Sequence, residues 1–141
     1  MIILDTNVLS EGFRANPHPA VRNWINAQPH QTLFLCSPVL AEIRFGIALL
    51  THGAKRDALQ AGADKLEFDQ YKGRILTFDA AAAKAYGELA AARQQRGTPI
   101  ARMDAFIAAI AVVTNAAVAT RDVYGFSGLG LNVINPFDFT P

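Results

Sequence analysis

The sequence predicts an α/β domain in which a parallel sheet lies between helices. Along its 141 residues, short apolar runs alternate with longer helical segments. Most of the short runs are apolar at consecutive positions, which is typical of parallel strands covered on both faces. Strands that alternate with helices imply right-handed crossovers within one layered domain. We expect a single domain over residues 1–141, because no linker, repeat or low-complexity segment divides the chain.

Five apolar runs are predicted to be strands. They are Ile2–Leu4, Thr32–Cys36, Ile75–Phe78, Ala116–Ala119 and Leu131–Ile134. Each is short and dominated by aliphatic or aromatic side chains, so we expect all five in one sheet.

Five helical segments separate these strands. The first begins at His18-Pro19, and the second at Ser37-Pro38, with Ser37 as N-cap and the proline in the first turn. Residues 55–71 supply the third. Asp79 caps the fourth, an alanine-rich helix that runs to about Arg96. Thr98-Pro99 repeats the cap-then-proline pattern and predicts the start of the fifth.

Composition favours a compact cytoplasmic protein. Hydrophobic residues make up 51% of the chain and charged residues 18%, which argues against disorder. The net charge of +1 neither requires nor excludes nucleic acid, since a local basic patch is enough. Cys36, the single cysteine, lies in an apolar run and is predicted to be a buried thiol. No secretory leader is visible, and the longest apolar run, residues 105–113, is shorter than the ~20 residues of a membrane span.

Two strands end on acidic residues of similar context. Ile2–Leu4 is followed by Asp5, Thr6 and Asn7, and Ala116–Ala119 is followed by Thr120, Arg121 and Asp122. In open α/β sheets, ligands bind outside the carboxyl ends of the strands. Asp and Asn also favour turns, so each carboxylate taken alone remains open to a purely structural explanation.

Two further acids lie near helix starts. Glu42 sits on an apolar shoulder of its helix, with Gly46 one turn later. Asp104 precedes an all-apolar helical stretch, which we expect to be buried. A first-turn Asp also favours the helix dipole, so this position has a structural alternative as well.

A cluster of these four carboxylates would favour a hard divalent cation. Two like charges ~4 Å apart cost roughly 4 kcal/mol at an effective dielectric of 20. Oxygen ligands without His or Cys suit Mg²⁺ or Mn²⁺, and the three histidines show no ligand spacing. Such a site indicates phosphodiester chemistry. Asp79, Glu11 and Asp138 are interpreted as capping, surface or turn residues.

Four segments resemble the PIN-domain nucleases, most closely the VapC/FitB-type toxins of bacterial toxin–antitoxin modules. They are "LDTNVLSE", "SPVLAEIRFGI", "ARMDAFIAAIA" and "VATRD". The likeness runs nearly end to end, including "ILTFDAAAAKAYGEL" and "NVINPF". It implies a PIN-like five-stranded parallel sheet sandwiched between helices.

The resemblance also implies an activity and a site. Asp5, Glu42, Asp104 and Asp122 match the acidic quartet that binds Mg²⁺ or Mn²⁺ for RNA cleavage. Asn7 and Thr120 match positions that support those carboxylates, and Thr6 lies beside them. The family's members are typically homodimers silenced by a cognate antitoxin, and they reach operator DNA only through the antitoxin complex. No membrane partner is implied.

Three alternatives follow from the same residues. Arg102 and Arg121 each lie within two residues of a proposed ligand, and either bind RNA phosphates or pair with the acids. An aspartyl phosphatase or a receiver domain is disfavoured, because Asn7 replaces the second Asp and no lysine follows Ala85. A catalytically silent binding protein of the same fold, acting with an antitoxin as a repressor complex, remains the alternative function.

Overall fold

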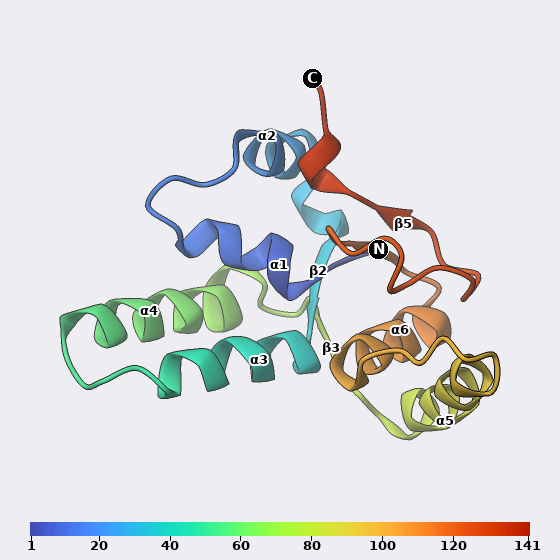
Figure 1. The fold of residues 1–141 in the computed structure, drawn as a ribbon. Helices are drawn as coiled ribbons and strands as arrows, with labels where there is room; N and C mark the ends of the chain where they lie inside the picture. The colour runs from blue at the N-terminus through green and yellow to red at the C-terminus, as the bar shows by residue number, and fades with distance from the viewer.

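The computed structural model describes residues 1–141 and has the predicted α/β architecture (Figure 1). Five strands form one sheet in the order β3-β2-β1-β4-β5, and every neighbouring pair is parallel. The strands are β1 (Ile2–Leu4), β2 (Leu33–Cys36), β3 (Ile75–Leu76), β4 (Ala117–Ala119) and β5 (Val133–Ile134).

Six α-helices connect and cover the strands, together with short 3-10 and π turns. The helices are α1 (Thr6–Leu9), α2 (Pro19–Ala27), α3 (Ser37–Ala48), α4 (Ala54–Lys65), α5 (Ala80–Gln95) and α6 (Arg102–Thr114). The turns are η1 (Ser10–Phe13), η2 (His30–Thr32), the π-type η3 (Leu66–Gln70) and η4 (Pro136–Asp138). Figure 1 shows the longer helices in two neighbouring pairs, α3 with α4 and α5 with α6, while α2 lies beside η4.

The core combines the inner strands with helix α6. Ile3, Leu35 and Val118 of the sheet are fully buried, as are Ile107 and Ile110 of α6. Burying one such side chain contributes roughly 1.5–3 kcal/mol, so these contacts dominate the stability of the sheet. The burial expected for residues 105–113 holds for residues 105 and 107–111, whereas Phe106 is half-buried and Val112 and Val113 at the end of α6 are exposed.

The predicted buried thiol is confirmed. Cys36 is fully buried at the end of β2, and burial raises the pKa of its thiol to about 12. A thiol with so high a pKa is not a nucleophile at neutral pH. None of the helices combines the length and apolar character needed to cross a membrane.

The strand order places a switch point between β1 and β4. From β1 the chain winds outward to β2 and β3, and it then returns to the other side of β1 to form β4 and β5. The crevice outside such a reversal is the usual ligand site of an open α/β sheet. Asp5 follows β1 and Thr120 follows β4, so both lie at this position.

The fifth helix starts later than predicted. Helix α6 begins at Arg102 with Ala101 as N-cap, not at Thr98-Pro99. The Thr98 carbonyl instead accepts a hydrogen bond from Nε of Arg93 at 2.7 Å. Residues 97–101 therefore form a connection fastened to α5. By contrast, the predicted cap Asp79 is confirmed, since its side chain accepts from the Ala82 backbone N–H. The helix predicted to begin at His18-Pro19 also does so, and the His18 side chain caps it.

Ser37 was predicted as an N-cap, and this is wrong. The structure assigns that position to Cys36, with no side-chain hydrogen bond. The Ser37 hydroxyl accepts from the Phe78 backbone N–H at 3.1 Å and ties α3 to the chain after β3. The predicted strands also lose end residues, and the predicted third helix is divided into α4 and the π turn η3. Thr32, for example, belongs to η2.

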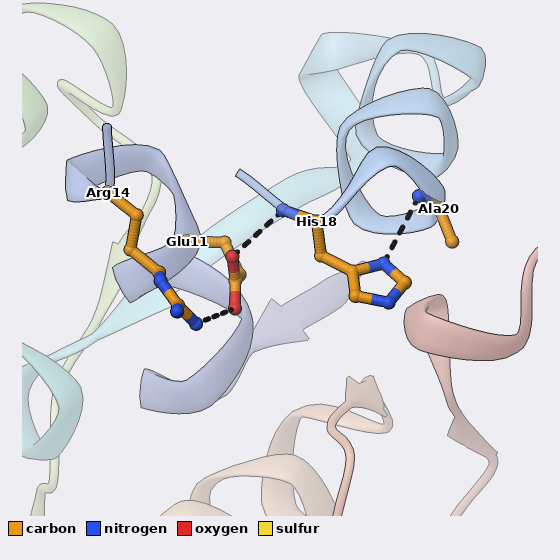
Figure 2. Close-up of polar contacts among 4 residues, drawn as sticks. All are labelled: Glu11, Arg14, His18 and Ala20. Carbon is orange, nitrogen blue, oxygen red and sulfur yellow. Dashed lines mark hydrogen bonds and ion pairs between the residues drawn. The ribbon is translucent and has the colours of Figure 1, made fainter. Parts of the chain in front are cut away.

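Glu11 was predicted to be a surface or turn residue, and this too is wrong. It lies in η1 and is only 4% exposed. Figure 2 shows its carboxylate between two donors: the His18 backbone N–H at 3.0 Å and Nη1 of Arg14 at 3.1 Å. The hydrogen bond from His18 is the main reason that the pKa of Glu11 is lowered. Glu11 therefore fastens η1 to the start of α2.

Candidate active site

Asp5 is the most buried carboxylate of the proposed quartet, with 4% of its surface exposed. Its Oδ1 accepts from the Thr6 backbone N–H at 2.7 Å, and it is the N-cap of helix α1. Its Oδ2 accepts from the Thr120 hydroxyl at 2.7 Å and from Nδ2 of Asn7 at 3.2 Å. These donors fix the orientation of the carboxylate. Asp5 therefore caps helix α1 and is held against Thr120 at the end of the neighbouring strand β4.

Asn7 and Thr120 connect the ends of β1 and β4. Besides Asp5, Nδ2 of Asn7 donates to Oγ1 of Thr120 at 3.2 Å, and its Oδ1 accepts from the Arg121 backbone N–H at 3.0 Å. Thr120 is fully buried, and its hydroxyl also accepts from the Asp122 backbone N–H at 3.0 Å. The network sets the position of the Thr120–Asp122 segment relative to Asp5.

Glu42 reaches the crevice from helix α3. Its Oε1 accepts from the Thr6 hydroxyl at 2.7 Å. Thr6 thus contacts two carboxylates, since its backbone N–H donates to Asp5 and its hydroxyl donates to Glu42. Thr6 was expected to lie beside the supporting residues, and the structure shows its hydroxyl in contact with Glu42.

Asp104 lies in the first turn of α6 and is half-buried. Burial, followed by repulsion from Asp5, Asp122 and Glu42, raises the pKa of Asp104 to about 6. Burial likewise raises the pKa of Asp5, with Glu42 and Asp122 adding to the effect against the hydrogen bonds from Thr120 and Thr6. The four acids therefore share one electrostatic environment at the crevice.

Asp122 is exposed and is held by its own loop. Its Oδ1 accepts from the Gly125 backbone N–H at 3.0 Å. A Cβ on Gly125 would collide with the Asp122 carboxylate, including Cγ at 2.9 Å. Glycine at position 125 therefore decides where this carboxylate points. Sequence reasoning missed Gly125, although an Asp followed three residues later by Gly is a typical turn pattern.

The two candidate phosphate-binding arginines do not pair with the acids. Arg102 and Arg121 are exposed, and neither takes part in any of the ion pairs of the structure. The Arg121 guanidinium instead lies 3.7 Å from the centre of the Phe137 ring, in a cation–π contact. The salt-bridge alternative is therefore absent from this structure.

The donor set of the crevice suits a hard cation, although its side chains are not closed around one. The carboxylates of Asp5 and Glu42 accept from the Thr120 and Thr6 hydroxyls, and Asp5 also accepts from the amide nitrogen of Asn7. Carboxylate oxygens are the ligand chemistry of Mg²⁺ or Mn²⁺. No three acidic, histidine or cysteine side chains form a ready-made metal-binding group. The mutual repulsion of Asp104 with the other acids is the feature that a cation would relieve.

A family model described as the PIN domain matches residues 2–127 of the chain. The chain belongs to the PIN-domain family. The resemblance noted in the sequence and the predicted fold are thus both confirmed.

This PIN domain is similar to several curated proteins along almost its whole length. It is 45% identical to plasmid stability protein StbB of Pseudomonas syringae pv. tomato and 41% identical to VapC ribonuclease Y4jK of Sinorhizobium fredii, each over 98% of this chain and 99% of the relative. It is 36% identical to toxin FitB of Neisseria gonorrhoeae, over 97% and 99% of the two chains. Among solved structures, FitAB bound to the IR36 DNA fragment matches with a TM-score of 0.92 and 35% identity, over 100% of this chain and 99% of that chain.

Proposed function

We propose that this PIN domain is a metal-dependent endoribonuclease and the toxin of a type II toxin–antitoxin module. The observation that carries the proposal is the grouping of Asp5, Glu42, Asp104 and Asp122 at the switch point of the sheet. Similar proteins that are named VapC ribonuclease and toxin FitB support both parts of it. The chain's net charge, +1, gives no large field, so basic side chains near the site must supply the attraction for RNA.

In this proposal the four carboxylates hold Mg²⁺ or Mn²⁺. When bound, such an ion stabilises charge on the phosphoryl group and lowers the pKa of an attacking water. The buried hydroxyl of Thr120 and the amide of Asn7 keep Asp5 oriented, as partners of ligating carboxylates commonly do. Thr6 performs the same task for Glu42.

The exposed arginines would position the substrate. Arg121 follows the buried Thr120, and its backbone N–H donates to Asn7, while its guanidinium lies over the Phe137 ring. Arg102 lies two residues before Asp104 on the surface of α6. Because neither is engaged by a carboxylate, both are available to phosphates of the RNA backbone.

The direct test is cleavage of RNA by the purified chain in Mg²⁺ or Mn²⁺, beside Asp5→Asn and Asp79→Asn purified identically. We expect cleavage that EDTA abolishes, that Asp5→Asn lacks and that Asp79→Asn keeps. Asp79 is a suitable control because it caps α5 and takes no part in the acidic group. Growth arrest on expression should follow the same pattern. Growth arrest by Asp5→Asn with an intact fold would instead favour the catalytically silent binding protein.

The antitoxin surface is proposed on helices α3 and α4 and the π turn η3. Three large apolar side chains are exposed there: Phe45 at 66%, Leu49 at 70% and Phe68 at 64%. Arg44 holds the two helical segments together through Asp64 at 2.8 Å and Glu67 at 3.1 Å. Exposed apolar side chains on a fixed scaffold are typical of a partner-binding surface. Hydrogen exchange with and without antitoxin tests this, and unchanged protection of these segments would contradict it.

A homodimer and an indirect contact with DNA complete the proposal. An open groove of about 570 Å³ lies beside α5 and α6, and the exposed Val112 lines it. We propose the apolar side of this groove, formed by Leu89 and Val112, as part of the dimer interface, which sedimentation of Val112→Glu would test. The similar FitAB complex is bound to a DNA fragment. For this chain we propose contact with operator DNA only through its antitoxin.

A further inference from the structure

The loop that follows Asp122 exposes an aromatic side chain. Tyr124 is 88% exposed, more than any other large hydrophobic residue of the chain. Phe126, two residues later, is 1% exposed and anchors the same loop in the core. An aromatic ring contributes to stability by burying its large surface, so folding does not account for Tyr124.

The loop that carries Tyr124 is fastened to the rest of the domain. Arg93 of helix α5 is buried, and its Nη1 donates to the carbonyls of Gly125 at 3.0 Å and Ser127 at 3.2 Å. The Ser127 hydroxyl donates to the Tyr124 carbonyl at 2.8 Å, and Asp122 accepts from Gly125. A ring presented on a fixed backbone binds its ligand with little loss of conformational freedom.

Tyr124 lines a polar and basic cavity of about 440 Å³. It is the cavity's only hydrophobic lining residue, and the others are Arg93, Arg96, Thr98, Ser127 and Gly128. No carboxylate lines the cavity. Arg93 supplies fixed positive charge, and Arg96 is exposed. One aromatic face beside two guanidinium groups, with no carboxylate, matches a base joined to a phosphate.

We propose that this cavity is a nucleotide subsite of the active site. Tyr124 stacks on one unpaired base of a single-stranded RNA, and Arg96 binds the adjoining phosphate. Tyr124 belongs to the loop in which Asp122 accepts from the Gly125 backbone N–H, so the proposed subsite and the proposed ligand Asp122 share one fixed loop. Stacking tolerates every base and requires that the base be unpaired, so the subsite selects single-stranded RNA over duplex. This inference rests on the proposed ribonuclease function.

The test measures RNA binding separately from cleavage. In an Asp5→Asn background, short single-stranded RNAs carry 2-aminopurine at each position in turn, and affinity and fluorescence quenching are recorded. We expect Tyr124→Ala to weaken binding by roughly 5- to 150-fold, which corresponds to about 1–3 kcal/mol for one stacked base. Tyr124→Phe keeps the ring and should bind within about twofold of its parent. Val123→Ala, on the same loop and 37% exposed, is the matched control.

Two further measurements, of position-dependent quenching and of salt dependence, test the same subsite. Quenching should concentrate at one position of the RNA and disappear with Tyr124→Leu, which keeps an apolar side chain without a ring. Arg96→Gln should lower the slope of log affinity against log salt by about 0.7, the value for one phosphate contact with a single strand. Because Tyr124 is almost fully exposed, circular dichroism and thermal unfolding of its variants should match the parent.

The possible results distinguish failure of the Tyr124 subsite from failure of the proposed ribonuclease function. Unchanged affinity and quenching in Tyr124→Ala, while the unsubstituted chain cleaves RNA, would overturn the subsite and leave the ribonuclease intact. Weakened antitoxin binding with unchanged RNA binding would assign Tyr124 to the protein partner and also overturn it. If the unsubstituted chain neither binds nor cleaves RNA, the ribonuclease proposal fails and the subsite fails with it.

Discussion

Asp104→Asn should stabilise the metal-free protein at neutral pH and leave it unchanged in acid. The folded-state pKa of Asp104 is raised from 3.8 to about 6, chiefly by burial and then by repulsion from Asp5, Asp122 and Glu42. The folded protein therefore holds a proton that the unfolded chain releases between these values. Stability falls as pH rises through this interval, and the deficit stays constant above about pH 6.

The size of the effect follows from the same interval. At 1.36 kcal/mol for each pKa unit, the raised pKa of Asp104 lowers the free energy of unfolding at neutral pH by at most about 3 kcal/mol. Asp104 is only half-buried, so solvent screening reduces this to about 1.5 kcal/mol. Loss of a favourable first-turn charge removes up to ~0.5 kcal/mol more. The expected gain is thus about 1 kcal/mol, or roughly 3–5 °C in Tm for a chain of this length.

Thermal unfolding of the parent and Asp104→Asn in EDTA, at about pH 7.5 and about pH 4, measures the stability gain above and near the lower end of the pKa interval of Asp104. Asp79→Asn is the control, because Asn caps a helix as well as Asp does and Asp79 lies outside the acidic group. Added Mg²⁺ should reverse the order, since the parent gains stability from an ion that the variant holds less well. A variant that is less stable than its parent at neutral pH in EDTA would refute the reasoning. Equal gains at both pH values would refute it too.

Three other substitutions test individual contacts. Thr120→Val removes a buried hydroxyl that contacts Asp5, and we expect a loss of about 1–3 kcal/mol in urea unfolding together with slower cleavage. Gly125→Ala should displace the Asp122 carboxylate, lowering kcat about tenfold or more while Tm stays within a few degrees of the parent. Glu11→Gln should lower stability by about 1–2 kcal/mol at neutral pH. Because the pKa of Glu11 is lowered in the folded state, this difference should disappear as pH falls below its unfolded value of 4.5.

Patterns confined to neighbouring residues were readable from the sequence. Consecutive apolar residues located all five strands, and the Asp79 cap follows from a side chain that bonds within the next turn. The acids after β1 and β4 were predictable as neighbours because parallel strands bring their carboxyl ends to one edge.

The errors came from partners outside the local pattern, some five to seven residues away and others more than thirty. Ser37 fits a cap by its local sequence, yet its hydroxyl is used by Phe78, 41 residues later. Thr98 fits a helix start, yet its carbonyl is used by Arg93, whose guanidinium also reaches the loop after Asp122. The burial of Glu11 depends in the same way on the start of α2 folding back over it.

Binding of Mn²⁺ by calorimetry tests the central claim most directly, namely that four carboxylates at the switch point act as one cation site. We expect the purified chain to bind Mn²⁺, Asp5→Asn and Asp104→Asn each to bind it about tenfold or more weakly, and Asp79→Asn to bind it as the parent does. Equal Mn²⁺ affinity in the parent and in Asp5→Asn, with both folded, would contradict the claim.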